Sequence, residues 1–178
     1  AYRGPVWGSW WGGGGPQVGW AVEMGRLEGL GADVEHHCVN DIAGHGARPL
    51  FFLDYLAFNR LEPAVVDIIV ASIVSACEAL DIQLAGGETA EMPGMVAEGV
   101  IELSGFAIGA AEKGDLIDPT TIQRGDVLVG FPSAGFHANG FSLVRRVIEA
   151  AKLDLSADEY RTLPLPTRPY HVQSCNLR

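Results

Sequence analysis

The sequence predicts an α+β fold in which a sheet packs against helices, followed by the start of a second α/β domain. Three observations support this prediction. Apolar runs at 49–58 and 100–112 are typical of strands. Apolar residues at three- and four-residue spacing over 63–80 indicate an amphipathic helix. A polar stretch at 113–125, containing Gly, Pro and Asp, separates this block from a later strand and helix, and we interpret it as a hinge.

We expect the first 24 residues to form an irregular arm. They contain the four tryptophans of the chain and the glycine run 12–15, without helical or strand periodicity. The alternative is a glycine-rich flap over a ligand. We take the irregular arm as the expected structure.

Regular elements follow from residue 31. We expect a helix over 32–47 that closes near Gly44 or Gly46, with an apolar side made of Val34, Cys38 and Ile42. The apolar run at 49–58 then predicts a strand buried on both faces. Asp54 interrupts this strand. A buried charge is costly unless it is paired or holds a ligand, so Asp54 is a candidate site residue.

The helix over 63–80 begins with Pro63, which suits a first helical turn. A short strand at 81–87 leads into "GGETAEMPG", residues 86–94, which we interpret as a ligand-binding turn. The strand 100–112 follows. Beyond the hinge we expect a strand at 126–131, a loop at 132–140 and an amphipathic helix at 141–152, as in a strand–loop–helix unit.

Composition and charge narrow the possible partners. The 178 residues are 48% hydrophobic and 19% charged, as in a folded protein. A formal net charge of -10 argues against a nucleic-acid partner, because binding to phosphates needs a basic surface. The three cysteines lack the spacing of a metal or disulfide motif, and neither a secretory signal nor a long apolar span is present. We therefore expect a cytoplasmic protein that does not bind membranes.

Side chains with oxygen atoms lie at or near the ends of three expected elements. They are Asn40, Asp41, Asp54, Glu88, Thr89 and Glu91. Mg²⁺ in nucleotide sites takes one or two carboxylates together with phosphate oxygens and waters. Glycines at 86 and 87 would let the backbone approach a phosphate closely. If these elements converge, they suit a magnesium-nucleotide site, whereas a solvated helix face is the simpler explanation for Asn40 and Asp41.

Two further patterns could indicate binding sites, and each also has a simpler explanation. His37, Asp41 and His45 share one side of the expected helix and could hold a transition metal, although surface histidines are the commoner explanation. The loop before the last helix could bind an anion through free N–H groups at the helix start, with His137 as a donor and Asn139 as the cap. A plain capped helix is the alternative there.

Five segments then stand in a distinctive order: "CVNDI", "GARPLFFLDYLA", "GGETAEMPGM", "GDVLVG" and "SAGFHANGFSLVRR". Together they resemble the phosphoribosylformylglycinamidine cyclo-ligase family, also called aminoimidazole ribonucleotide synthetase. The similarity runs from about Gly25 to Lys152, and "PTRPY" at 166–170 resembles a later family stretch. A single motif would be moderate support, but five in order are strong support.

The resemblance implies an N-terminal domain with a mixed sheet that binds ATP with Mg²⁺, and a homodimer formed through this sheet. A second domain completes the site for formylglycinamidine ribonucleotide. The implied reaction is an ATP-dependent ring closure in purine biosynthesis, which relies on positioning and charge neutralisation of the transferred phosphoryl group. The implied organisation is an arm at 1–24, a partial ATP-binding domain at 25–112, a hinge at 113–125 and an incomplete C-terminal domain at 126–178.

The resemblance also implies roles for individual residues, although it assigns no catalytic residue and leaves that role unknown. The expected ATP or phosphate residues are Asn40, Gly86, Gly87, Glu88 and Thr89. The expected metal ligands are Asp41, Asp54 and Glu88. The expected loop for a phosphate of substrate or nucleotide contains Ser133, His137, Asn139 and Gly140.

The chain departs from the family pattern upstream of "CVND". Family members carry Gly-Thr-Asp-Gly-Val-Gly-Thr-Lys there, whereas this chain reads "GGGGPQVGWAVEMGR", so an Asp and a Lys are missing. Family members also extend beyond "PTR", and we interpret the chain as a fragment. Two alternatives to a cyclo-ligase are a catalytically inactive binding or dimerisation module and another ATP-using member of the superfamily. "GGETAEMPG" and "FFLDY" favour the cyclo-ligase.

Overall fold

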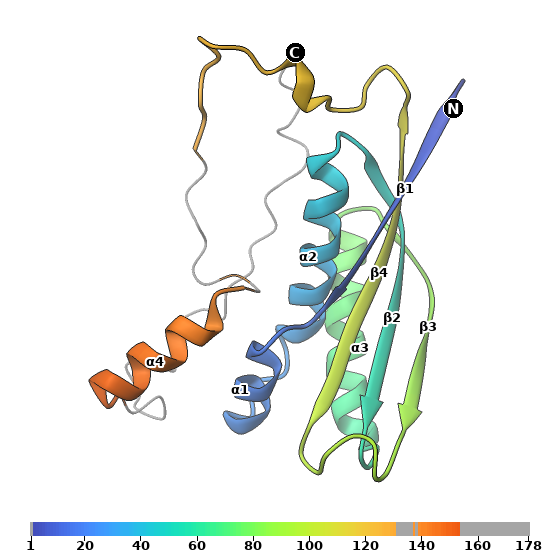
Figure 1. The fold of residues 1–178 in the computed structure, drawn as a ribbon. Coiled ribbons are helices and arrows are strands. Elements are labelled where there is room, and N and C mark those ends of the chain that lie inside the picture. The colour runs from blue at the N-terminus through green and yellow to red at the C-terminus, as the bar shows by residue number, and fades with distance from the viewer. Residues whose placement is uncertain (1, 131–136, 138, 154–178) are drawn as a thin grey trace.

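The computed structural model describes residues 2–130, 137 and 139–153, and it contains a four-stranded mixed sheet with helices against one face (Figure 1). The strands are β1 (Pro5–Gly13), β2 (Arg48–Phe58), β3 (Gln83–Glu91) and β4 (Ile101–Glu112). The helices are α1 (Gln17–Glu23), α2 (Leu30–Gly44), α3 (Pro63–Ala79) and α4 (Phe141–Ala151), with a short 3₁₀ turn at Pro119–Thr121. The expected α+β class with a mixed sheet is confirmed.

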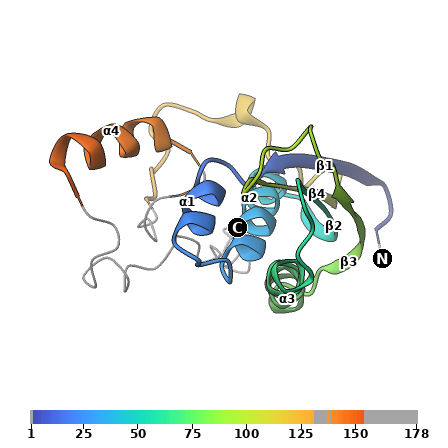
Figure 2. The same cartoon turned by 90° about the horizontal axis from the view of Figure 1, so that it is seen from below.

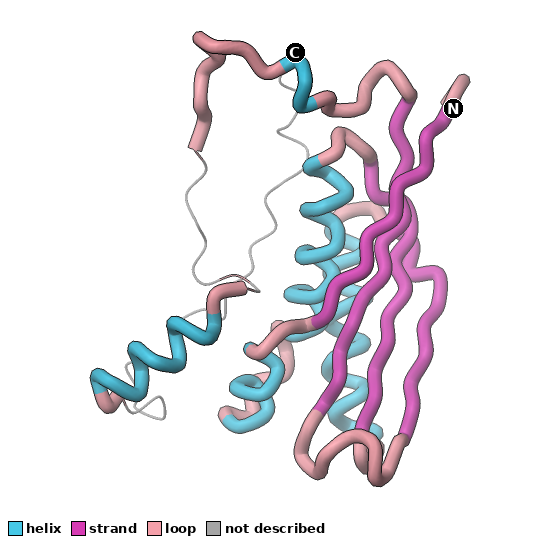
Figure 3. The backbone as a smooth tube through the Cα atoms, in the orientation of Figure 1, coloured by secondary structure: helices cyan, strands magenta, loops and turns pink. Residues whose placement is uncertain are grey.

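The strand order is β1-β4-β2-β3 (Figure 3). β2 and β3 are parallel, because α3 carries the chain back along the sheet between them. β4 runs antiparallel to both β2 and β1. The sheet therefore has two edges, β1 and β3.

The core lies between the sheet and the pair α2 and α3 (Figure 2). Phe52 and Leu56 of β2 are fully buried, as are Ile69 and Ile73 of α3. Close packing requires glycine at Gly105 of β4, because a Cβ there would lie 2.7 Å from Cε2 of Phe52. This face of the sheet is apolar and sealed by helices.

The other face of the sheet carries no helix in the part of the chain that the structure describes. Cross-strand pairing places Trp11 beside Phe106, and Phe106 beside Leu53, in one row across β1, β4 and β2. Trp11 is 67% exposed and Phe106 36% exposed. Contiguous exposed apolar residues on a sheet face are typical of an interaction surface. We call this row, with its neighbours Trp7 and Phe51, the open face.

The helices expected over 32–47, 63–80 and 141–152 and the strands at 49–58 and 100–112 are confirmed, with ends shifted by a few residues. The burial expected on both faces of 49–58 is wrong in part, because Phe51 is 38% exposed on the open face. No described helix is both long enough and apolar enough to cross a bilayer.

Three other expectations are wrong. The arm at 1–24 contains β1 and α1, because residues 5–13 pair with β4, a partner distant in sequence. The supposed turn at 86–94 is mostly strand, because residues 86–91 pair with β2. Residues 126–130 form no strand, and Val127, Leu128 and Val129 are exposed without a neighbouring strand in the described chain.

Candidate functional site

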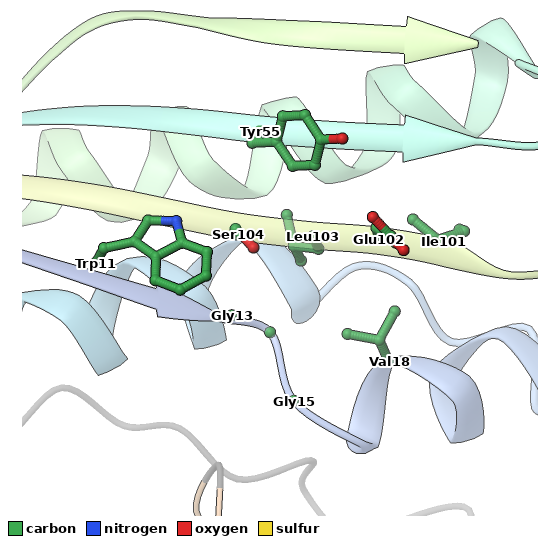
Figure 4. A pocket seen from close by; sticks show the side chains of 10 residues that line it. Trp11, Gly13, Gly15, Val18, Tyr55, Ile101, Glu102, Leu103 and Ser104 are labelled. Carbon is green, nitrogen blue, oxygen red and sulfur yellow. The ribbon is translucent and has the colours of Figure 1, made fainter. Parts of the chain in front are cut away.

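A pocket of about 640 Å³ opens where β1 ends and β4 begins. The backbone of Gly13, Gly14 and Gly15 forms one wall, and the side chains of Tyr55, Ser104 and Glu102 line another. Figure 4 shows Trp11, Ser104 and Tyr55 on three neighbouring strands, with the helices behind the sheet. The pocket therefore combines aromatic rings, a hydroxyl and a carboxylate with accessible backbone.

The glycine run has a structural reason for its composition. A Cβ on Gly12 would lie 2.6 Å from Cδ2 of His37, and one on Gly14 would lie 2.8 Å from Val18. Small residues are thus required where β1 passes α2 and turns into α1. The glycine-rich flap, our alternative for this segment, agrees with its position at a pocket better than the irregular arm does.

Asp54 lies on the helix-covered face of β2, beside Gly87 of β3. The two residues are cross-strand partners, and a Cβ on Gly87 would lie 2.6 Å from Cγ of Asp54. Gly87 therefore leaves the space that the carboxylate fills. Burial raises the pKa of Asp54 above its ordinary value. The pKa of the Cys77 thiol on α3 is raised mainly by burial, with smaller contributions from Glu35 and Asp54.

Glu88 and Asp54 lie on opposite faces of the sheet. Glu88 pairs with Tyr55, one position beyond the Asp54 and Gly87 pair, and successive side chains of a strand point to opposite sides. Glu88 and Thr89 are exposed on the edge strand β3. Among the described residues, no group of three or more His, Cys, Asp and Glu is arranged to hold a metal ion. Asp41, Asp54 and Glu88 do not form one metal site in this structure.

Asn40 and Asp41 are half-buried on α2. The stripe of His37, Asp41 and His45 is not a metal site in the described chain, because the His37 ring packs against Gly12 while His45 is exposed. Neither Asn40 nor Asp41 lines the pocket near Gly13 to Gly15.

The expected phosphate loop is described only in part, because Ser133 lies outside the described residues. His137 and Asn139 are exposed. The expected Asn139 cap is wrong: Gly140 is the N-cap of α4, with φ +86°, and no side chain caps the helix. This left-handed backbone favours glycine, so the chain geometry selects Gly140 for the capping position. Figures 1 and 2 place α4 on the far side of α1 from β3, so the loop and Gly86 to Thr89 are not brought together.

The sequence reasoning missed a buried polar pair on α2. Glu35 is 0% exposed and His36 is 5% exposed, and 3.5 Å separates Oε2 of Glu35 from Nε2 of His36. Neither Glu35 oxygen nor His36 Nδ1 has a hydrogen-bond partner among the described residues. Burial raises the pKa of Glu35 to about 8 and lowers the pKa of His36 to about 4. Both groups are therefore neutral near pH 7, and their contact is not an ion pair.

This pair predicts how stability depends on pH. The pKa of Glu35 is raised in the folded state, so stability falls as pH rises from about 4.5 to about 8. The pKa of His36 is lowered, so stability falls as pH drops from about 6.5 to about 4. The two effects cancel between about 4.5 and 6.5, and stability should decline by about 2 kcal/mol from pH 6.5 to pH 8.

Urea unfolding at pH 5.5, 6.5 and 8 measures this decline. Glu35→Gln should remove most of the loss between pH 6.5 and 8, because glutamine does not titrate. An unchanged decline in Glu35→Gln would contradict the assignment of the alkaline loss to Glu35.

Two models of one protein family match the chain, one in each part of the sequence. Residues 18–111 match the family model described as AIR synthase related protein, N-terminal domain. Residues 123–178 match the model for the C-terminal domain. Phosphoribosylformylglycinamidine cyclo-ligase from Burkholderia mallei (strain SAVP1) is 46% identical over 174 residues, which cover 95% of this chain and 50% of the relative. The enzyme of the same name from Burkholderia vietnamiensis is 47% identical over the same length.

Solved structures support the fold alone. Thiamine-monophosphate kinase from Stenotrophomonas maltophilia K279a matches with a TM-score of 0.67 and 20% identity, covering 92% of this chain and 49% of that one. T. maritima PurL complexed with AMPPCP matches with a TM-score of 0.53 and 17% identity, covering 64% and 18% of the two chains. The chain spans about half the length of the curated relatives it matches.

Proposed function

Because the chain belongs to the AIR synthase related family, we propose that it is part of an ATP-dependent cyclo-ligase that converts formylglycinamidine ribonucleotide to aminoimidazole ribonucleotide. The 46% identity to cyclo-ligases over 95% of the chain carries this proposal. ATP is the proposed co-substrate, in line with the PurL neighbour named as an AMPPCP complex. A cytoplasmic location and a role in purine biosynthesis belong to the same proposal.

The proposed nucleotide residues remain those inferred from the sequence: Asn40, Gly86, Gly87, Glu88 and Thr89. Gly86 supplies exposed backbone on an edge strand, where a Cβ would meet no atom within 4 Å and a phosphate can approach, whereas the space beside Gly87 holds the Asp54 carboxylate. We propose that Mg²⁺ enters with ATP and supplies charge neutralisation for phosphoryl transfer. No single ion is assigned to Asp41, Asp54 and Glu88 together, because Asp54 and Glu88 lie on opposite faces of the sheet.

The activity is tested by incubating the purified chain with ATP, Mg²⁺ and formylglycinamidine ribonucleotide. Formation of aminoimidazole ribonucleotide, followed by mass spectrometry, is the expected result. No product at high protein concentration, together with no ATP binding by calorimetry, would contradict the enzymatic proposal.

The second candidate function is a catalytically inactive binding or dimerisation module. The open face favours it, because Trp11 and Phe106 expose apolar surface that a second chain would cover. A dimer in light scattering combined with no response in an ATP titration would select this module over the enzyme.

We also propose a homodimer that uses the open face. Substitution Phe106→Glu should weaken dimerisation at least thirtyfold, about 2 kcal/mol, because it places a charge at the centre of the apolar row. The matched control is Met95→Glu, which changes an 82% exposed apolar residue outside the open face. Analytical ultracentrifugation measures both. Equal dimer affinity in the two variants would place the interface elsewhere.

A further inference from the structure

An aromatic contact joins α4 to α1. Phe141, the first residue of α4, is 4% exposed, and its ring meets Trp20 edge-on with centroids 5.4 Å apart and planes at 69°. Arg145, one helical turn later, places Cζ 5.9 Å from the centroid of the same indole. Edge-to-face packing and a cation over an indole are both attractive geometries.

Phe141 is the buried residue of α4. Val144 and Ile148, on the same side of the helix, are half-buried, whereas Leu143 is 68% exposed and Val147 is 53% exposed. The position of α4 on the described domain therefore depends strongly on the contact with Trp20.

The contact connects the two parts of the chain that matched separate family models. Trp20 lies in the segment 18–111, and Phe141 and Arg145 lie in the segment 123–178. α1 begins two residues after Gly15, which lines the pocket, and Gly140 immediately precedes Phe141. The aromatic contact thus stands between the pocket loop and the residues His137, Asn139 and Gly140.

We infer that Trp20 is a positioning residue that docks α4 on α1 and thereby fixes His137, Asn139 and Gly140, which lead directly into α4. The docking itself rests on the contacts with Phe141 and Arg145. Its effect on ligand binding rests on the proposed function, together with the sequence expectation that this loop contacts a phosphate of the substrate.

Hydrogen exchange measured by mass spectrometry tests the docking without any ligand. In Trp20→Ala, protection of the α4 amides should fall at least tenfold, while protection in β2 and β4 stays unchanged. Trp20→Phe keeps an aromatic ring and should retain most of the protection. Trp7→Ala is the matched control, because it removes an indole that is 60% exposed on the open face and should leave α4 unchanged.

A second variant keeps the test decisive if Trp20→Ala loses protection throughout the sheet. Phe141→Leu removes the partner ring from the other side and should loosen α4 in the same way. Unchanged exchange of α4 in both Trp20→Ala and Phe141→Leu would overturn the inference.

A titration with formylglycinamidine ribonucleotide by calorimetry tests the effect on ligand binding, because the loop lies apart from the proposed ATP residues Gly86 to Thr89. Affinity should fall at least tenfold in Trp20→Ala and recover in Trp20→Phe. Unchanged affinity in a variant whose α4 is loosened would overturn the positioning role. A wild-type chain that binds no formylglycinamidine ribonucleotide would overturn the proposed function, while the exchange result would still decide the docking.

Discussion

Replacement of Glu35 by methionine should stabilise the protein by about 3 kcal/mol at pH 7. The carboxyl group is fully buried, and neither oxygen has a hydrogen-bond partner among the described residues. Burial raises its pKa to about 8, so the folded state must hold a proton that the unfolded chain releases near its ordinary pKa of 4.5. Methionine has a similar length, no polar oxygen and no proton to hold, so the cost disappears.

Urea unfolding at two pH values makes this prediction specific. The gain should shrink at pH 5, because this pH lies close to the ordinary pKa of 4.5 and holding the proton in the folded state then costs much less than at pH 7. Glu78→Met is the matched control, because Glu78 is exposed on the neighbouring helix α3 and its replacement should change stability by less than about 0.5 kcal/mol. Equal effects of Glu35→Met and Glu78→Met would contradict the cost assigned to burial.

Replacement of Gly31 by alanine should destabilise the protein by about 3 kcal/mol. A Cβ at this position would lie 2.5 Å from the carbonyl oxygen of Ile69 and 2.5 Å from the amide nitrogen of Ile73. Both atoms belong to the backbone of α3, which cannot move aside as a flexible side chain can. The substitution would also disturb the neighbouring Ala32, whose N–H donates to Oγ of Ser72 over 3.0 Å.

Gly44→Ala provides a control within the same helix. A Cβ on Gly44 would meet no atom within 4 Å, so alanine there should be neutral or stabilising by up to about 1 kcal/mol through helix propensity. Thermal unfolding of the two variants measures the difference. A similar melting temperature for Gly31→Ala and wild type would show that α2 and α3 separate without cost.

Two contacts hold α2 in place. Gly31 allows the helix to approach α3 closely, and Cys38 donates from Sγ to the carbonyl oxygen of Gly105 on β4 over 3.4 Å. Between these two points of close approach, Glu35 is fully buried and shielded from water. The unfavourable environment of Glu35 is a consequence of the packing that makes the rest of α2 stable.

Local patterns predicted most of the regular elements. The apolar periodicity of 63–80, with Pro63 at its start, is sufficient for α3, because helix hydrogen bonds form within one segment. The apolar strands at 49–58 and 100–112 are likewise visible without their partners. The site residues were chosen from residue type and from the family resemblance, and their places in this structure only partly bring them together, as Asp54 and Gly87 illustrate.

Elements that depend on distant partners were not predictable in this way. Residues 5–13 contain glycines and tryptophans without alternation. They become a strand because β4, at Ile101–Glu112, supplies the hydrogen bonds from a distant part of the sequence. The pair Glu35 and His36 looked like ordinary polar helix residues.

The sequence by itself determined the α+β class, the family and the positions of the main helices and strands, because these depend on short-range periodicity and on collinear motifs. Only the tertiary structure decided which strand lies at each edge, that Asp54 and Glu88 face opposite sides of the sheet, and that Trp20 meets Phe141. Strand pairing and ring packing join residues far apart along the chain, and no local pattern specifies which distant partner a segment will meet.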